Sequence, residues 1–281
     1  MPDWTLSEFL FELEADSKRR VLFVEGLRDL AFWRGLVPPL DRGDTVIYPI
    51  TAIKCELADG GERGRLLCIA RTVLATKSSG RILFFADADD DRILGRKEPA
   101  NVVFTDGRDL ESYGLTQACL ICLCVRGIGM DEVAAEAVLN RVVAVTRPIG
   151  VLRVASARAD LKLPFQRTFE ARRDLRRFLI GDSLDIGRLV STLLQNAGIS
   201  LAKTDEVGEL LRQETDRLSG VGHDQIVHGK DFTRALATFF GLDDGQAERL
   251  LFLSIDFADI ASRPNIAQVR GWMRTVTSQE G

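Results

Sequence analysis

The chain has 281 residues, 46% of them hydrophobic and 28% charged, which is enough to bury the core of one large domain or two ordinary domains. Its formal net charge of -4 excludes a general polycationic surface, so any contact with nucleic acid must be a local patch. No apolar run approaches the roughly 20 residues that cross a bilayer, and the N-terminal residues lack the pattern of a secretory signal. The five irregularly spaced cysteines are typical of a reducing compartment. We therefore expect a cytoplasmic protein with no membrane contact.

The first strand predicted along the chain ends in a carboxylate. Val21 to Val24 has the pattern of a buried strand, and Glu25 follows it directly. A helical pattern then runs from Leu27 to Leu36, with Asp29 in its first turn. A negative charge is favourable there because the N-terminus of a helix carries partial positive charge. The sequence thus places two carboxylates at one junction between a strand and a helix.

A second strand, in the segment RILFFADADDD at residues 81–91, ends in more carboxylates. Ile82 to Ala86 is too short for an independent helix and too apolar for a surface, which favours a buried strand of a parallel sheet. Asp87 and Asp89 follow, and they point to the same side while the chain stays extended. Ligands of open α/β sheets bind at the carboxyl ends of strands, and carboxylate oxygens suit a hard divalent cation. The pattern predicts a metal site at this strand end.

Further strands and helices alternate around these two. Short strands are predicted at Thr45–Ile50 and Val102–Thr105, and a helix at about Arg63–Thr76. The last of these strands runs into TDGRDLESYGL, which holds a third acidic group. Its members are Asp106, Asp109 and Glu111. The alternation predicts an α/β fold with a largely parallel sheet and helices on both faces.

Strand patterns become rare beyond about residue 125, and helical patterns replace them. The predicted helices are Leu6–Ala15 at the start of the chain and then Asp131–Val145, Arg167–Phe178, Leu184–Leu194, Asp205–Leu218, Lys230–Phe240, Gln246–Phe257 and Ile266–Val276. We therefore expect two domains, an α/β domain at residues 1–125 and a mostly helical domain at residues 126–281.

Two of these motifs together resemble a known family. Glu-Gly-x-x-Asp at residues 25–29 and Asp-x-Asp at residues 87–89, each after an apolar strand, resemble the TOPRIM fold. This Rossmann-like module is the metal-binding catalytic domain of topoisomerases, bacterial primases and overcoming-lysogenisation-defect (OLD) nucleases, and the resemblance covers about residues 18–115. The segment TDGRDLESY narrows the resemblance to one family, the stand-alone TOPRIM-type proteins found beside ABC-type ATPases in bacterial anti-phage loci. This family includes the nuclease effector of PARIS systems.

The resemblance implies a role for individual residues. Glu25 corresponds to the TOPRIM glutamate, which acts as a metal ligand or as a general acid or base. Asp87 and Asp89 would hold Mg²⁺ or Mn²⁺, Asp29 would join them as in OLD-type nucleases, and Glu111 would complete the acidic ring or bind a second metal.

The family also implies a reaction and partners. The expected protein is a Mg²⁺-dependent nuclease acting on DNA or RNA, an anti-phage effector controlled by an ABC-type ATPase, and a homodimer. A lysine outside the acidic motifs supports the transition state in OLD-type nucleases, and Lys230 is the candidate, beside the alternative of an ordinary lysine at the start of a helix. One departure from topoisomerase-like members is Arg92, which replaces the glycine of DxDxDG. The turn must therefore be built differently, and Asp91 becomes a candidate helix cap.

Four other interpretations stay open at this stage. A TOPRIM module can bind metal, nucleic acid or a partner as a non-catalytic regulatory subunit. Residues 87–98 match several positions of an EF-hand loop, although Arg92 occupies the glycine position. The DxD motif also occurs in phosphotransferases, in which the first aspartate is a nucleophile. A zinc site would use side chains that lie far apart in the sequence, namely Cys119, Cys122, Cys124, His223 and His228.

A local basic patch lies between Arg153 and Arg177, where eight basic residues outnumber three acidic ones. Such an excess in an acidic protein would suit a phosphate backbone. The alternative is a solvated helix face in which Glu170 and Asp174 pair with the cations.

Overall fold

The computed structural model describes residues 3–55, 61–97, 99–169 and 175–275. The chain forms two compact units. The sheet unit takes in the described parts of Met1–Ala88, Arg96–Asp106 and Phe257–Gly281, and the helical unit takes in Asp89–Gly95 and the described parts of Gly107–Asp256. The expected domains at residues 1–125 and 126–281 stay predictions, because a compact unit defined by its contacts is not the same as a domain that folds independently.

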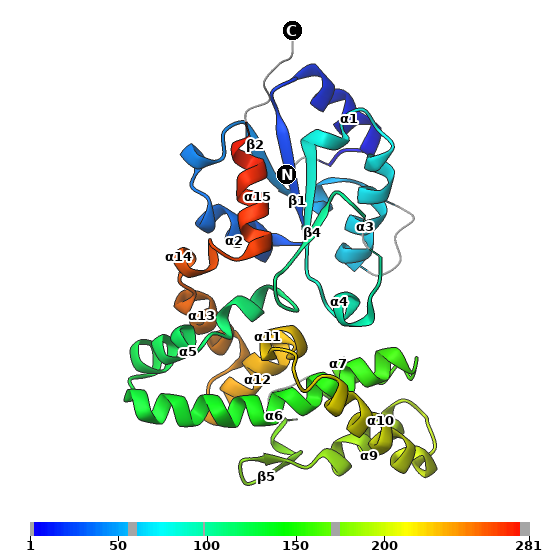
Figure 1. Ribbon diagram of the computed structural model, residues 1–281, viewed down its shortest axis with the longest axis vertical. Helices are drawn as coiled ribbons and strands as arrows, with labels where there is room; N and C mark the ends of the chain where they lie inside the picture. Colours follow the sequence, from blue (N-terminus) through cyan, green and yellow to red (C-terminus); the bar gives the residue numbers. More distant parts are fainter. Residues whose placement is uncertain (1–2, 56–60, 98, 170–174, 276–281) are drawn as a thin grey trace. The chain divides into compact units, whose positions relative to one another are not determined.

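Four parallel strands in the order β2-β1-β3-β4 form the sheet (Figure 1). They are β1 Arg20–Val24, β2 Thr45–Pro49, β3 Ile82–Ala86 and β4 Val102–Phe104. Every residue of β1 and β3 is buried, as expected of parallel strands covered on both faces. The register sets Val24 beside Phe85, so the two central strands end side by side. The predicted α/β class with a parallel sheet is confirmed.

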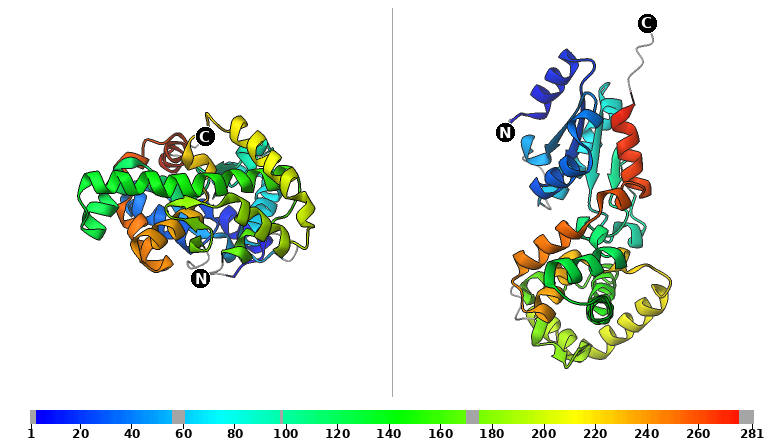
Figure 2. Two further views of the ribbon diagram at one scale, coloured as in Figure 1. Left: turned by 90° about the horizontal axis from the view of Figure 1, so that it is seen from below. Right: turned by 90° about the vertical axis from the view of Figure 1, so that its left-hand side faces the viewer.

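Helices cover both faces of this sheet, and Figure 2 shows α1 and α15 on opposite sides of the strands. The helices of the sheet unit are α1 Leu6–Ala15, α2 Leu27–Leu36, α3 Gly61–Leu74, α14 Phe257–Ile260 and α15 Pro264–Arg274, with short turns at η1 Pro39–Asp41, η2 Ile50–Ala52 and η3 Ser79–Arg81. Helices α1 and α3 share one apolar cluster with Phe23 and Phe84. On the other face Trp33 of α2 meets the ring of Phe85 edge-on at 4.9 Å. The two faces alternate along β3 because successive side chains of a strand point in opposite directions.

Helix α15, the last of the described helices, packs with the sheet through Asn265, which lies 159 positions after its partner Asp106 in sequence. Asn265 in the first turn of α15 donates its backbone N–H to Asp106 Oδ1 at 2.9 Å, and its side-chain amide donates to the carbonyl of Phe104 at 2.8 Å. A carboxylate at the N-terminus of a helix is favoured by the helix dipole. Asp106, a member of the third acidic group, therefore has a structural role in fixing α15.

The helical unit contains one long helix, α6, with shorter helices around it (Figure 1). Its elements are α4 Asp91–Leu94, η4 Leu110–Gly114, α5 Gln117–Cys122, the π-helix η5 Leu123–Ile128, α6 Glu132–Arg158, α7 Phe165–Thr168, β5 Leu179–Ile180, β6 Ser183–Leu184, α9 Ile186–Asn196, η6 Leu201–Lys203, α10 Thr204–Arg217, α11 His223–Ile226, α12 Gly229–Phe240 and α13 Asp244–Ser254. The mostly helical character predicted for this half of the chain is confirmed.

Helix α6 continues well past the predicted end at Val145 and includes Pro148. Proline removes one backbone donor and normally interrupts a helix. The helix continues because its buried face continues, with Ile149 and Leu152 extending the apolar stripe that Val145 begins. The helix predicted over 167–178 has its centre, residues 170–174, outside the described residues.

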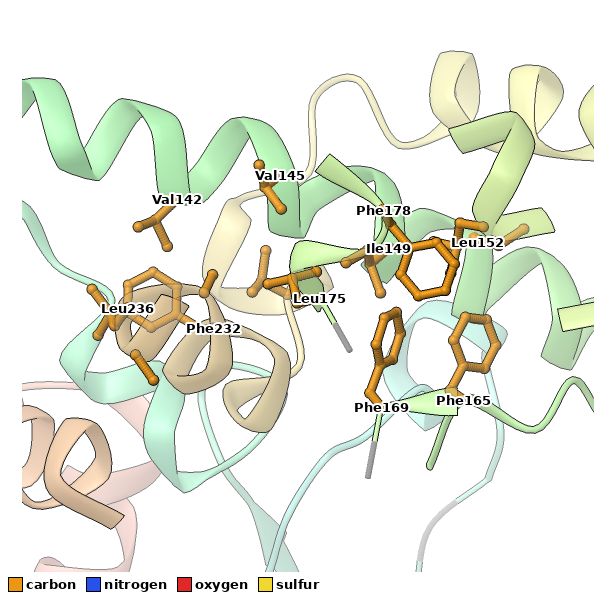
Figure 3. Close-up of a cluster of buried hydrophobic side chains, with 14 of the residues drawn as sticks. Val142, Val145, Ile149, Leu152, Phe165, Phe169, Leu175, Phe178, Phe232 and Leu236 are labelled. Carbon is orange, nitrogen blue, oxygen red and sulfur yellow. The ribbon is translucent and has the colours of Figure 1, made fainter. Parts of the chain in front are cut away.

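The core of the helical unit lies under α6 (Figure 3). Phe232 of α12 is fully enclosed there, and Phe169 and Phe178 meet edge-on with their ring centroids 5.7 Å apart. Edge-to-face contact is favourable because the positive edge of one ring meets the negative face of the other. These aromatic side chains link α12 and the segments after α7 to the single long helix.

A buried ion pair also joins α6 to α12. Arg153 Nε and Nη2 donate to the two carboxylate oxygens of Asp231 at 2.7 and 3.0 Å, and Arg234 adds a contact at 3.2 Å. The Arg153 guanidinium also lies 4.4 Å from the ring centroid of Phe165. Burial is the largest influence and raises the pKa of Asp231, but Arg153, through its charge and its hydrogen bond, and the other neighbours, Arg234 among them, together outweigh burial and hold this pKa below its ordinary value. The Asp231 side chain is only 2% exposed, so its charge depends on this pairing.

We predict that Arg153→Ala lowers the free energy of unfolding by about 3 kcal/mol, because it removes the bidentate partner of a buried carboxylate and leaves only the single contact from Arg234. The measurement is urea unfolding at pH 7. The matched control is Arg141→Ala on the same helix, since Arg141 forms an exposed pair with Asp182 at 3.3 Å. That variant should cost at most about 1 kcal/mol. Equal losses in the two variants would contradict a structural role for the Arg153 pair.

The same variant has a predicted pH dependence. In the wild type the depressed pKa of Asp231 gives stability that is present above the unfolded value near 4 and is lost as the pH falls through the folded value. In Arg153→Ala the strongest of the influences that lower this pKa is gone, while burial and the contact with Arg234 remain, so the carboxyl binds a proton at a higher pH than in the wild type. The stability difference between the two proteins should therefore be largest near neutral pH and shrink as the pH falls toward about 4.

Candidate metal centre

The two central strands of the sheet bring Glu25 and Asp87 together. In the strand order β2-β1-β3-β4, the strand that follows β1 in the chain lies on one side of the central pair, and the strand that follows β3 lies on the other side. The strand order therefore reverses between β1 and β3. Glu25 follows the end of β1 and Asp87 follows the end of β3. The backbone N–H of Asp87 donates to Glu25 Oε1 at 2.9 Å. Ligands of open α/β sheets bind at such a reversal, outside the carboxyl ends of the strands.

Arg63 of α3 contacts both of these residues. Its Nε donates to the backbone carbonyl of Asp87 at 3.2 Å and lies 3.8 Å from Glu25 Oε1. Its guanidinium lies 5.7 Å from the ring centroid of Phe104. A positive charge beside Glu25 lowers the cost of placing other carboxylates near it. The sequence analysis did not identify Arg63, because one arginine in an amphipathic helix carries no pattern that marks it.

Asp29 has a local structural role. Its Oδ2 accepts the backbone N–H of Gly26 at 3.1 Å and so caps the helix in which it lies. Burial raises the pKa of Asp29, although the N–H of Gly26 opposes that shift. Such a cap needs a carboxylate three residues after the N-cap residue, which accounts for the spacing of Gly26 and Asp29 in the Glu-Gly-x-x-Asp motif. A carboxylate has two oxygens and about four lone pairs, so the cap does not use up its capacity for a metal.

The chain passes from the sheet unit to the helical unit between Ala88 and Asp89. Asp89 has a positive φ of 47°, a left-handed conformation that aspartate tolerates better than most residues. Asp90 pairs with Arg108 at 2.6 Å and is the N-cap of α4, which begins at Asp91. The prediction of Asp91 as the cap of this helix is therefore wrong by one residue. The left-handed residue of this turn is Asp89.

Around Asp109 the helical unit contains a second group of carboxylates. Asp109 accepts the backbone N–H of Gly229 on Oδ2 at 2.6 Å and that of Ser112 on Oδ1 at 3.1 Å. Burial raises the pKa of Asp109 to about 8, with the charges of Glu111 and Asp89 adding to the effect. Gly229 is required at this contact, since a Cβ there would lie 2.3 Å from the Cβ of Glu111.

Lys230 is exposed in the first turn of α12. The residue before that helix, His228, is its N-cap and accepts the backbone N–H of Lys230 on Nδ1 at 3.2 Å. An acceptor at Nδ1 fits the neutral imidazole, and burial lowers the pKa of His228 well below its ordinary value. The His-Gly-Lys segment thus forms a capped helix start with an exposed ammonium group.

The predicted site residues are distributed over both units. Glu25, Asp29 and Asp87 belong to the sheet unit, whereas Asp89, Glu111 and Lys230 belong to the helical unit. Within the part of the chain that the structure describes, no three His, Cys, Asp or Glu side chains form a group arranged to hold a metal ion.

The structure bears on two alternatives from the sequence. The EF-hand interpretation is wrong, because the strand β3 precedes the acidic segment and α4 occupies residues 91–94, where the calcium loop would lie. Glu98, the last position of that loop, lies outside the described residues. The zinc interpretation gains no support, since the described cysteines and histidines form no such group. Cys119 is buried, with its thiol directed at the carbonyl of Tyr113 at 3.9 Å.

The basic stretch from Arg153 to Arg177 is used in part for packing. Arg153 is paired with Asp231, and Arg158 Nε lies 2.9 Å from Oε1 of the buried Glu214. These two cations stabilise the helical unit and do not form a free phosphate-binding surface. Four other members of the stretch lie outside the described residues, namely Glu170, Arg172, Arg173 and Asp174.

Comparison of this chain with protein-family models and with curated proteins found no match. Among the helices of residues 3–55, 61–97, 99–169 and 175–275, none has the length and apolar character needed to cross a membrane.

We predict that Mg²⁺ binding stabilises the protein through Glu25. At a concentration ten times the dissociation constant, the gain is about 1.4 kcal/mol, which corresponds to roughly 3–5 °C in the melting temperature. Glu25→Gln keeps an oxygen for the Asp87 N–H but removes the charge, so it should abolish the shift. The measurement is thermal unfolding in EDTA and in Mg²⁺. Glu14→Gln, an exposed carboxylate on α1, is the matched control and should keep the wild-type shift. An unchanged shift in Glu25→Gln would contradict the site.

Proposed function

We propose that this chain is a Mg²⁺-dependent TOPRIM-type nuclease that hydrolyses phosphodiester bonds of DNA or RNA. The observation that supports this most strongly is the hydrogen bond between Glu25 and the Asp87 amide at the reversal point of the parallel sheet. Parallel sheets bind their ligands at this position. The two residues belong to the two motifs, Glu-Gly-x-x-Asp and Asp-x-Asp, on which the resemblance to TOPRIM proteins depends.

The donors at these strand ends fit a magnesium ion. Glu25, Asp29 and Asp87 offer only carboxylate oxygens, which are the ligands that Mg²⁺ prefers. Mg²⁺ usually binds through one or two carboxylates, with water and substrate phosphate completing its octahedron, so a preformed cage of three protein ligands is not required. When bound, such an ion neutralises phosphate charge and lowers the pKa of an attacking water. Asp89 and Glu111, in the helical unit, stay predicted ligands.

The protein's own residues would divide the work at this position. Glu25 would hold the ion or take up the proton of the attacking water on its carboxylate. The Asp87 carboxylate would hold the ion, while the backbone of Asp87 is fixed by Glu25 at its N–H and by Arg63 at its carbonyl. Such fixed positioning matters because a misplacement of about 1 Å can cost roughly 100-fold in rate.

We predict that Glu25→Gln and Asp87→Asn each reduce cleavage by at least about 100-fold, as expected for loss of an acid-base group or metal ligand. The assay incubates purified protein with labelled plasmid, single-stranded DNA and tRNA in Mg²⁺, Mn²⁺ or EDTA. Circular dichroism checks that both variants fold, and Glu14→Gln should cleave at the wild-type rate. Wild-type rates in both site variants would show that the site is wrongly assigned.

The non-catalytic alternative differs in one measurable result. A regulatory TOPRIM subunit would show the Mg²⁺-dependent shift in melting temperature but no cleavage, either alone or with an ATPase partner. The anti-phage role, the ATPase partner and the homodimer rest on the resemblance alone. If cleavage begins only when an ATPase encoded beside this chain is added, the partner-controlled nuclease is supported over the regulatory subunit.

Lys230 gives a separate prediction. If its ammonium group supports the transition state, Lys230→Ala should lower the cleavage rate by at least about tenfold with little change in substrate affinity. The side chain is exposed at a helix start, so its removal should leave the melting temperature unchanged. Full activity of Lys230→Ala would assign this residue to the helix start alone.

A further inference from the structure

Arg108 holds the short segment of the helical unit that begins at Asp89. Its backbone carbonyl accepts the N–H of Asp89 at 2.6 Å, and its Nη1 lies 2.6 Å from Oδ1 of Asp90. The side chains of this ion pair are only 4% and 19% exposed, so water screens it little. Arg108 therefore contacts both Asp89 and the residue that follows it.

The other contacts of Arg108 attach it to α11. Its backbone N–H donates to the carbonyl of Asp224 at 2.8 Å, and Nη1 donates to the carbonyl of Ile226 at 3.2 Å. Gly107 permits this close approach, since a Cβ at that position would lie 2.8 Å from the Asp224 carbonyl oxygen. The position of Arg108 is thus fixed by a helix that is distant in sequence.

Asp89 depends on such contacts because its backbone is left-handed, with a φ of 47°. A residue with a Cβ normally avoids this conformation. Arg108 restrains the chain on both sides of it, at the N–H of Asp89 and at the carboxylate of Asp90. Without the guanidinium, Asp90 loses its ionic partner, and the turn can relax to more favourable backbone angles. Such a change would redirect the Asp89 carboxylate.

The charges around Asp109 show that these groups are neighbours. Burial raises the pKa of Asp109 and the charge of Glu111 adds to this effect, whereas the N–H of Gly229 and the charge of Arg108 oppose it. Asp89 makes a smaller contribution that raises this pKa. Arg108 thus supplies positive charge among carboxylates that include two predicted ligands, Asp89 and Glu111.

We propose that Arg108 is a positioning residue, which holds the backbone turn from which Asp89 would bind Mg²⁺. This inference rests on the proposed function, in which Asp89 is a predicted ligand. Arg108 is 3% exposed, so it acts through Asp89 and Asp90 and not on a substrate. Mutation of a group that orients a metal ligand weakens metal binding by about 10–100-fold.

The test measures the Mn²⁺ affinity of the full-length chain by titration, with the free ion detected by electron paramagnetic resonance. Arg108→Gln and Asp90→Asn each remove one partner of the ion pair, and each should bind Mn²⁺ at least about tenfold more weakly than the wild type. Arg108→Lys keeps a positive charge beside Asp90 without the planar fork, so its loss should be smaller, about threefold. Loss of binding in Glu25→Gln identifies the measured ion as that of the proposed centre.

A double variant tests whether Arg108 acts through Asp89. Arg108→Gln combined with Asp89→Asn should bind Mn²⁺ within about twofold of Asp89→Asn alone, because the group that Arg108 positions is then already changed. The matched control is Arg153→Gln, which breaks another buried ion pair of the same unit. It should lower the melting temperature and leave the Mn²⁺ affinity at the wild-type value.

Three results would overturn the proposal and leave the metal centre in place. They are wild-type affinity in folded Arg108→Gln or Asp90→Asn, a full additional loss in the double variant, and an equal loss of affinity in Arg153→Gln. The last of these would assign the effect to general destabilisation. If the wild type binds no Mn²⁺, or if Glu25→Gln binds it unchanged, the proposed centre itself is contradicted and the role of Arg108 with it.

Discussion

The hydrogen bond from the Asp87 amide to Glu25 is the contact on which the account of the sheet unit depends. It exists because β1 and β3 are neighbouring parallel strands whose ends differ by one residue in register, with Val24 at the end of β1 beside Phe85 of β3. Two acidic residues then meet at one sheet edge, and their repulsion would destabilise the fold without compensation. Arg63 provides that compensation from α3, since it contacts Glu25 and the peptide of Asp87. The packing that orders the strands therefore also sets the spacing of the carboxylates.

The helical unit uses buried charge in a different way. Arg153 and Asp231 join α6 to α12, and Asp109 receives backbone N–H groups from Ser112 and Gly229. In each case a buried polar group is paired or hydrogen-bonded, which is the condition for burying it at acceptable cost. Several charged residues that look like candidates for substrate binding in the sequence thus hold helices together.

Sequence patterns predicted the strands well because burial on both faces requires short, continuous apolar runs such as Ile82–Ala86. They also predicted correctly that Glu25 and Asp87 each directly follow a strand. They did not identify Arg63, the length of α6 or the packing of α15 on the sheet. Those features depend on contacts between distant residues, such as the bond from Asn265 to Asp106, and local periodicity carries no information about them.

The most direct test of the central claim is the position of a bound metal ion. Crystals of the protein soaked in Mn²⁺ should show an anomalous peak within about 2.2 Å of carboxylate oxygens of Glu25 and Asp87, the distance expected for a small octahedral cation. The account predicts this peak in the wild type and its loss in Glu25→Gln. A strong peak elsewhere, or none at these two residues at saturating Mn²⁺, would contradict the assignment of the metal centre to the ends of β1 and β3.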